Sequence, residues 1–241
     1  MRKERFMRKL AVITARGGSK RIPRKNILPF LGKPIIAYSI EAAINSGEFD
    51  EVMVSTDDEE IAQIAIRYGA TVPFLRSSET SNDYATTVDV LMEVLGEYEK
   101  RGQKFDILCC IYPTAPFVTD IKINNALEIL MNSDADTVLP VVAYSYPPQR
   151  SLVVEDGLLT LKFPEYRTSR SQDLEPYYHD AGQFYLMKVD ALKENKSIMK
   201  GRITPFELPE MEVQDIDNMT DWQIAELKYQ FMSKNESNCP K

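Results

Sequence analysis

The chain has 241 residues, a hydrophobic content of 44% and a formal net charge of -7. This size suits one α/β domain with a small appended element, and the negative charge argues against bulk nucleic-acid binding, which needs many cationic contacts to phosphate. The three cysteines have neither a disulfide framework nor a zinc-site spacing, and adjacent Cys109 and Cys110 are expected on opposite faces of a strand. Because the sequence shows no signal peptide or transmembrane stretch, we expect a cytoplasmic protein with no membrane partner.

Short β-branched runs alternate with helical patterns along most of the chain. We predict strands at 10–14, 51–56, 71–75, 105–112, 137–143 and 183–189. We predict helices at 34–46, from the cap at Asp57 or Asp58 to about 69, and at 86–101, 119–132 and 221–232. Pro34 is expected in the first turn of the first helix, with Gly47 ending it. This alternation builds a parallel sheet with right-handed crossovers, whose ligands bind at the carboxyl ends of the strands.

The alternation breaks after Ser145. The Asp156-Gly157 turn lies between two apolar runs, which predicts a hairpin within an insert over 146–178. We expect a single domain over 7–234. Segments 1–6 and 235–241 are expected to be disordered, and Met7 offers a second plausible start.

The stretch ARGGSKRIPRKN (15–26) places five cations and two glycines directly after the first predicted strand. It matches neither a Walker A motif nor a G-x-G-x-x-G fingerprint. Glycines still let backbone amides approach an anion, and Arg16, Lys20 and Lys25 add positive charge. A nucleoside triphosphate with Mg2+ would suit this stretch. The alternative is an ordinary solvated loop.

A second feature is the pair Asp215 and Asp217. In an extended segment these side chains project to one face, where two like charges are costly without a cation. Together with a triphosphate they would suit Mg2+. The alternative is an exposed turn or a cap for the helix beginning near Asp221.

Three weaker features lie elsewhere. The acidic pair at 57–58 is explained by helix capping. The YPTAP segment (112–116) predicts a rigid turn where a buried strand ends. The single histidine, His179, gives no basis for a catalytic role or a pH switch.

Taken together, the segments ARGGSKRIPRKN, GKPIIAYSIEAA, FDEVMVSTDDEEIA, RSSETSNDYATT, YPTAPF and DIDNMTD resemble, in order and over nearly the whole chain, those of the nonulosonate cytidylyltransferases. This family makes CMP-activated sialic acids. The resemblance implies a Rossmann-like nucleotidyltransferase fold with a mainly parallel sheet. It also implies transfer of CMP from CTP to the anomeric hydroxyl of a nine-carbon 2-keto sugar acid, with release of pyrophosphate. Mg2+ is implied as cofactor, and so is a homodimer whose inserted hairpins reach across to the partner subunit.

The resemblance also assigns roles to residues. Arg16, Lys20 and Lys25 hold the triphosphate and stabilise the leaving pyrophosphate, whereas Arg21 and Arg24 are expected to face solvent only. Asp215 and Asp217 match the metal carboxylates, where a metal could also lower the pKa of the attacking hydroxyl. The residues implied in CTP binding are Ala15, Arg16, Gly17, Ser19, Asn26, Ser81 and Asn82.

The sugar side departs from the pattern of the sialic acid synthetases. Tyr112 replaces a usual glutamine, and Ala181-Gly182 replaces a usual Asn-Gly pair. These departures, with the segments around Arg170 and at 178–185, favour pseudaminic acid, a sugar with two acylamino groups and a methyl terminus. Arg170 is a candidate for the sugar carboxylate, and His179 and Gln183 are candidates for the acylamino groups.

The alternatives on sugar identity are neuraminate, legionaminate and 3-deoxy-octulosonate. The alternative from another class is a catalytically silent nucleotide-binding module. The simultaneous presence of triphosphate cations and metal carboxylates argues against that module.

Overall fold

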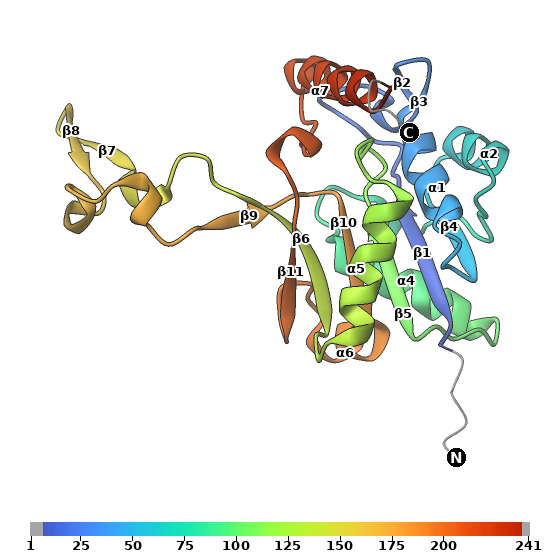
Figure 1. Ribbon diagram of the computed structural model, residues 1–241. Coiled ribbons are helices and arrows are strands. Elements are labelled where there is room, and N and C mark those ends of the chain that lie inside the picture. Colours follow the sequence, from blue (N-terminus) through green and yellow to red (C-terminus); the bar gives the residue numbers. More distant parts are fainter. Residues whose placement is uncertain (1–6, 238–241) are drawn as a thin grey trace.

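The computed structural model describes residues 7–237, and its centre is a sheet covered by helices on both faces (Figure 1). The strands run in the order β11-β6-β10-β5-β1-β4, with β9 also paired to β6. Neighbours β5, β1 and β4 are parallel, as are β6 and β11, whereas β10 is antiparallel to both β5 and β6. The predicted α/β class with a mainly parallel sheet is therefore confirmed. The strands of this sheet are β1 (Lys9–Thr14), β4 (Glu51–Ser55), β5 (Ile107–Ile111), β6 (Thr137–Ala143), β9 (Tyr178–Asp180), β10 (Phe184–Lys188) and β11 (Ile203–Glu207).

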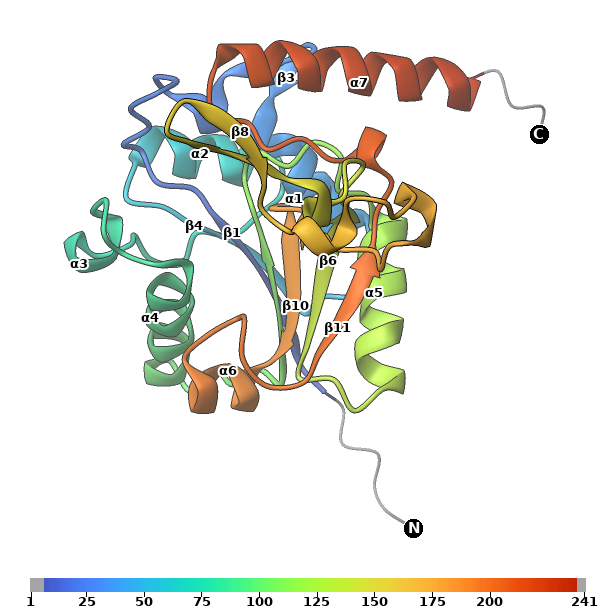
Figure 2. The same ribbon diagram turned by 90° about the vertical axis from the view of Figure 1, so that its left-hand side faces the viewer.

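Two helical layers enclose the sheet, and Figure 2 shows α4 and α5 on opposite sides of it. Helices α1 (Ile35–Asn45), α2 (Glu59–Arg67) and α5 (Asp120–Asn132) bury apolar side chains on one face, and α4 (Thr87–Lys100) and α6 (Val189–Asn195) on the other. Side chains of β5 alternate between the two cores, so that Cys109 joins the first and Cys110 the second, as their adjacency predicts. Both thiols are free and buried.

Side-chain caps fix the helix starts close to where the sequence places them. Asp58 accepts from the Ile61 amide at 3.0 Å and caps α2, and Thr119 caps α5. Thr86 and Asp89 form a reciprocal capping box at the start of α4. Pro34 is the exception. It has an extended backbone in the short strand β3 (Lys33–Pro34), which pairs with β2 (Pro29–Phe30), so it precedes α1 instead of lying in its first turn.

Several boundaries differ from the sequence-based expectation. The strand predicted at 71–75 is wrong: only Thr71 bridges Met53, and the segment contains Pro73. The predictions omitted β11 and α6. Helix α7 (Met219–Ser237) runs past residue 232, the predicted end of the last helix, and the disorder predicted for 1–6 and 238–241 concerns residues outside the described part of the chain.

The predicted insert stands out from the body of the domain (Figure 1). Its strands β7 (Leu152–Glu155) and β8 (Leu158–Leu161) pair only with each other, through a turn with positive φ at Asp156 and Gly157. The insert begins and ends at neighbouring positions, because the Tyr144 amide donates to the Tyr177 carbonyl at 2.9 Å. Tyr178, which was placed in the insert, already belongs to β9 of the main sheet.

Helix α7 lies across the carboxyl end of the sheet (Figure 1). Trp222 packs edge-on against Phe30, with ring centroids 5.5 Å apart. The Asp221 carboxylate accepts from the amides of Asp217 at 2.9 Å and Asn218 at 3.0 Å. The helix start therefore fixes the segment that carries the two predicted metal carboxylates. Within residues 7–237, no helix combines the length and apolar character needed to span a membrane.

Candidate active site

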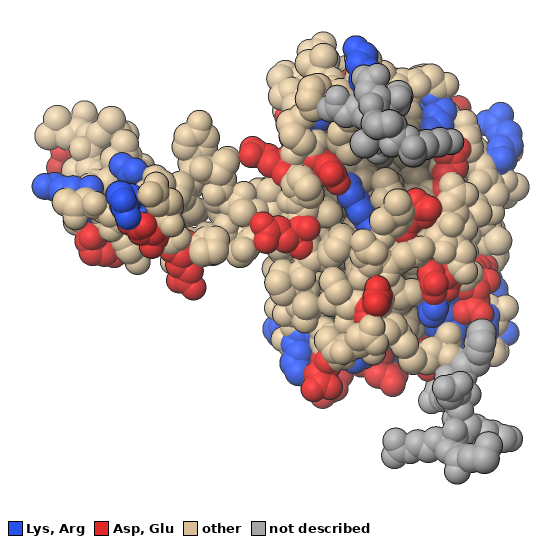
Figure 3. Space-filling model, viewed as in Figure 1, with Lys and Arg blue, Asp and Glu red and all other residues tan. Residues whose placement is uncertain are grey.

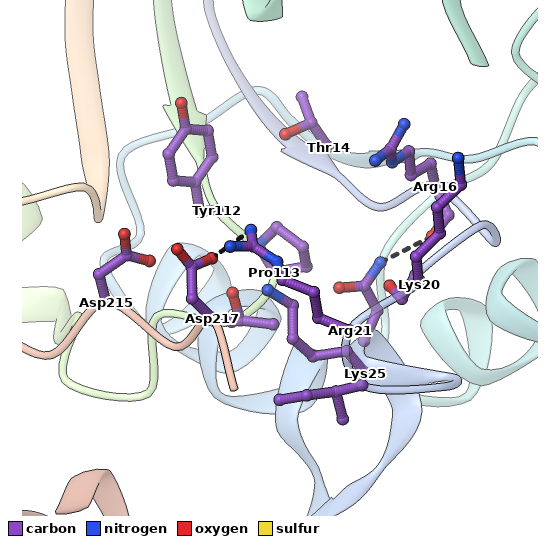
Figure 4. A pocket seen from close by; sticks show the side chains of 13 residues that line it. Thr14, Arg16, Lys20, Arg21, Lys25, Tyr112, Pro113, Asp215 and Asp217 are labelled. Carbon is purple, nitrogen blue, oxygen red and sulfur yellow. Dashed lines mark hydrogen bonds and ion pairs between the residues drawn. The ribbon is translucent and has the colours of Figure 1, made fainter. Parts of the chain in front are cut away.

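A cavity of about 440 Å3 opens at the carboxyl ends of β1 and β5, below the segment that leads into α7. Figure 4 shows basic side chains from the loop after β1 facing Asp215 and Asp217 across it. This is the edge of the sheet at which doubly wound folds bind ligands. The cavity is lined by Thr14, Arg16, Ser19, Lys20, Arg21, Ile22, Lys25, Asn26, Tyr112, Pro113, Thr114, Asp215 and Asp217.

The basic loop has a defined backbone, unlike an ordinary solvated loop. The Gly17 amide donates to the Asp57 carboxylate at 2.9 Å, and the Asn26 side chain donates to the Arg16 carbonyl at 2.8 Å. A Cβ at Gly17 would lie 2.8 Å from an oxygen of Asp58, so this close approach needs glycine. The acidic pair after β4 thus anchors the loop as well as capping α2.

Two arginines of the loop have different environments, although both were expected to face solvent only. Arg24 has a left-handed backbone and pairs with Asp58 and Glu60, outside the cavity. Arg21 lines the cavity, and its Nη2 lies 2.6 Å from Oδ1 of Asp217. Neither arginine therefore only faces solvent, although 68% of the Arg21 side chain is exposed.

Lys25 contacts the segment between the two acids. Its Nζ donates to the Ile216 carbonyl at 2.7 Å, and burial lowers the pKa of Lys25 while the charges of Asp217 and Asp215 oppose that change. Burial, reinforced by the nearby Asp217 charge, raises the pKa of Asp215. Because Ile216 packs into the core, both acids face the cavity, as their spacing predicts.

Arg16 and Lys20 lie at the entrance of the cavity and share one acidic partner. Arg16 Nη1 donates to Asp83 Oδ1 at 2.9 Å and to the Asn82 carbonyl at 3.1 Å, and Lys20 pairs with the other oxygen of Asp83. The Lys20 hydrogen bond lowers the pKa of Asp83. Both cations are partly exposed, so an anionic ligand can compete with Asp83 for them.

A second cavity of about 240 Å3 shares Thr14, Arg16 and Tyr112 with the first. Its buried charged residue is Arg76, whose Nη2 donates to the Ser55 carbonyl at 2.6 Å. Asn82 lines this cavity, but Ser81 does not, because the Ser81 hydroxyl donates to the Ser77 carbonyl within α3 (Ser78–Ser81). The remaining lining residues are Thr80, Asp83, Ala85, Thr86, Thr87 and Val90.

Tyr112 forms the wall between the two cavities. Its hydroxyl lies 3.2 Å from that of Thr87, and its ring meets Tyr185 edge-on at 5.6 Å. The Tyr185 hydroxyl donates to Asp180 Oδ2 at 2.8 Å. Burial raises the pKa of both Tyr112 and Tyr185, which keeps their hydroxyl groups protonated and able to donate.

The other residues expected on the sugar side do not line either cavity. Gln183 is 1% exposed, and its amide donates to the Glu212 carbonyl at 2.8 Å. Gln183 therefore supports the backbone of the segment before α7. His179 is exposed on β9 with its ring 5.0 Å from Tyr144. Arg170 pairs with Asp173 on the projecting insert.

Ala15 and Gly17, which were implied in CTP binding, do not line either cavity. Ala15 is buried and its amide donates to the Ser55 carbonyl at 2.9 Å, and Gly17 is committed to Asp57 as described. Sequence reasoning missed Arg21, Arg76, Asp83 and Thr87. The last three fall within the quoted RSSETSNDYATT segment, which was the available signal for them.

Among residues 7–237, no cluster of three or more histidine, cysteine, aspartate or glutamate side chains is arranged to hold a metal ion. The candidate metal centre therefore consists of Asp215 and Asp217. Two carboxylates suit Mg2+ when phosphate oxygens complete its shell. The raised pKa of Asp215 fits this donor set, because a cation between the acids would relieve their repulsion.

Loop cations facing paired carboxylates at the carboxyl end of a mainly parallel sheet define a nucleotidyltransferase of Rossmann-like fold. A sequence model described as cytidylyltransferase matches residues 10–226. The chain belongs to this cytidylyltransferase family, as the ordered motifs led us to expect.

Its relatives match most of the chain. A pseudaminic acid cytidylyltransferase of Campylobacter jejuni is 42% identical, covering 92% of this chain and 97% of the relative. A CMP-N,N'-diacetyllegionaminic acid synthase of Legionella pneumophila is 36% identical, covering 91% and 95%. Among solved structures, a CMP:2-keto-3-deoxy-manno-octonic acid synthetase complexed with CTP matches with a TM-score of 0.68 at 20% identity, covering 94% of this chain and 99% of that one. That structural likeness supports the fold.

Proposed function

We propose that this protein transfers CMP from CTP to the anomeric hydroxyl of a nonulosonic acid, with pseudaminic acid as its sugar. The hydroxyl loses its proton to water and its oxygen forms a bond to the α-phosphorus of CTP. The bond from that phosphorus to the bridging oxygen breaks, and pyrophosphate leaves with the electron pair. The observation that carries this proposal is that one cavity is lined by Lys25 and Arg16 together with Asp215 and Asp217. Phosphoryl-type transfer depends mainly on such positioning and charge compensation.

The two cavities suit the two parts of CTP. Arg16 lies at their junction and, with Lys20, supplies charge for the triphosphate once the ligand displaces Asp83. The second cavity would take the cytidine, with Asn82 and Arg76 in its wall. Lys25 holds the Ile216 carbonyl, so it couples the triphosphate side to the acidic segment.

We propose Asp215 and Asp217 as the residues that hold Mg2+. When bound there with the nucleotide, Mg2+ would neutralise charge on the phosphate oxygens. The fixed backbone at Asp217, which donates to Asp221, keeps its carboxylate aimed into the cavity.

The choice of pseudaminic acid rests on relatives and on one wall residue. The Campylobacter relative is 42% identical and the legionaminic acid synthase is 36% identical, over comparable lengths. Tyr112 gives the sugar side of the cavity a flat apolar ring held between Thr87 and Tyr185. An apolar wall suits a sugar with a methyl terminus better than one with a hydroxylated tail.

The test is CTP-dependent pyrophosphate release with four sugars: pseudaminate, legionaminate, neuraminate and 3-deoxy-octulosonate. We expect pseudaminate to give the highest kcat/KM, by about tenfold or more over the others. Turnover of neuraminate equal to that of pseudaminate would contradict the proposed sugar but not the proposed reaction. Absence of turnover with all four would favour the silent nucleotide-binding module.

We further propose that the protein is a homodimer joined through its inserts. The pairs Leu152–Leu161 and Val154–Leu159 put four apolar side chains on one face of the β7–β8 hairpin. Three of them are strongly exposed, at 57%, 70% and 68% for Leu152, Val154 and Leu159. Residues other than Lys, Arg, Asp and Glu also cover much of the tip of the insert (Figure 3). An isolated two-stranded hairpin is marginal in water, so a partner surface would stabilise it.

Replacing Val154 by aspartate should therefore convert the dimer to a monomer, because a carboxylate cannot be buried unpaired in an apolar interface. Sedimentation equilibrium would measure the change. The matched control is Ile66→Asp, which introduces the same carboxylate in place of an exposed β-branched side chain on α2, outside the insert. Dimerisation of V154D as strong as that of I66D would contradict the proposal.

A further inference from the structure

We propose that Arg21 is a positioning residue that competes with the metal ion for Asp217, so that divalent metal binds productively only together with the nucleotide. The inference rests on the proposed metal role of Asp217. The observation that supports the inference is the 2.6 Å ion pair between Arg21 Nη2 and Asp217 Oδ1, two residues that line the cavity.

Of the two partners, the arginine is the one free to move. The Asp217 backbone is fixed by its hydrogen bond to Asp221, and the neighbouring Ile216 is packed in the core and bonded to Lys25. The Arg21 side chain is 68% exposed and extends from the loop across the cavity mouth. Separating the pair therefore requires a rotamer change at Arg21 only.

The other loop cations do not occupy this position. Lys25 donates to a backbone carbonyl, Arg16 and Lys20 pair with Asp83, and Arg24 pairs with acids at the start of α2. Arg21 thus places a positive charge directly on a proposed metal ligand. A guanidinium and a divalent cation cannot both lie against the same carboxylate oxygen.

A triphosphate changes this competition. Its phosphate oxygens offer the Arg21 guanidinium a bidentate anionic partner within the same cavity. The released Asp217 carboxylate is then available to the metal that arrives with the nucleotide. Arg21 accordingly suppresses binding of metal alone and contributes charge to the triphosphate afterwards.

The test is Mn2+ titration of the full-length protein without nucleotide or sugar, with free Mn2+ followed by its electron paramagnetic resonance signal. Removing the competitor in Arg21→Gln should tighten Mn2+ binding by about two- to fivefold, the range expected for loss of one exposed ion pair. The matched control is Arg24→Gln, which removes the same charge from the same loop. It should leave Mn2+ affinity at the wild-type value.

The double variant R21Q/D217N identifies the site. It should lose the Mn2+ affinity that R21Q gains. An R21Q affinity equal to that of the wild type, an equal gain in R24Q, or a gain that persists in R21Q/D217N would each overturn the inference. Because the titration involves no turnover, its outcome is separate from that of the sugar panel, which tests the proposed reaction itself.

Discussion

Replacing Asp217 by asparagine should lower kcat by roughly 10²–10³-fold, because loss of a metal carboxylate removes several kcal/mol of transition-state stabilisation. The substitution keeps the shape of the side chain but removes its charge. The fold should be unaffected, since the side chain is partly exposed and the Asp217 amide still donates to Asp221. Pyrophosphate release at saturating CTP and sugar would measure the change.

The matched control for this variant is Asp134→Asn, the same substitution at an exposed position just before β6, at the amino end of that strand. It should keep near-normal turnover. Thermal unfolding of both variants would show whether either has lost stability. Turnover of D217N within a few-fold of the control would remove the metal role assigned to Asp217.

The second large effect is expected for Lys25→Ala. This variant should lower kcat/KM for CTP by roughly 10²–10³-fold, the usual cost of deleting one preorganised charged donor. The variant loses both the charge that we propose to face the triphosphate and the hydrogen bond from Lys25 to the Ile216 carbonyl, which positions the acidic segment. Steady-state kinetics at varied CTP would measure the loss.

Arg24→Ala is the control for that experiment, because it removes a cation from the same loop but outside the cavity. An exposed ion pair contributes little, so at most about a fivefold effect is expected there. A loss in K25A no larger than that in R24A would show that Lys25 is only a solvated cation.

Local sequence signals predicted the parts of the fold that have local causes. The helix starts near Asp58, Thr86 and Thr119 and the strand at 137–143 were predicted correctly because polar caps and a continuous apolar run act within a few residues. The antiparallel direction of β10 could not be predicted. A buried strand has the same apolar composition in either direction, and its neighbours β5 and β6 are chosen by tertiary packing.

Strands near the edges of the sheet were also difficult to predict. Strand β11 contains Pro205, which argues against a central strand but is tolerated at the edge of a sheet, where β11 lies. The 71–75 segment failed for a related reason: it has β-branched residues at its start, but Pro73 limits its pairing to a single bridge.

The site was predictable where residues close in sequence act together. The sequence indicated a common location for two groups of residues. One is the closely spaced pair Asp215 and Asp217, and the other is the set of cations Arg16, Lys20 and Lys25. The pairing of Arg21 with Asp217 spans 196 positions in the sequence, so no local pattern reveals it. The sugar side was least predictable, because Gln183 serves the backbone before α7 and Arg170 lies on the insert.

The closely spaced ends of the insert have a consequence for how this domain can change. Tyr144 and Tyr177 are hydrogen-bonded neighbours, and β6 and β9 continue the main sheet from them. In the topology of the sheet, the whole insert takes the place of a turn between the antiparallel strands β6 and β9. Its length and composition can therefore vary with little cost to the nucleotide side, because closing a longer loop adds free energy only slowly. The sequence of the insert, and with it the proposed subunit contacts, can therefore change while the main sheet and its cavities stay constant.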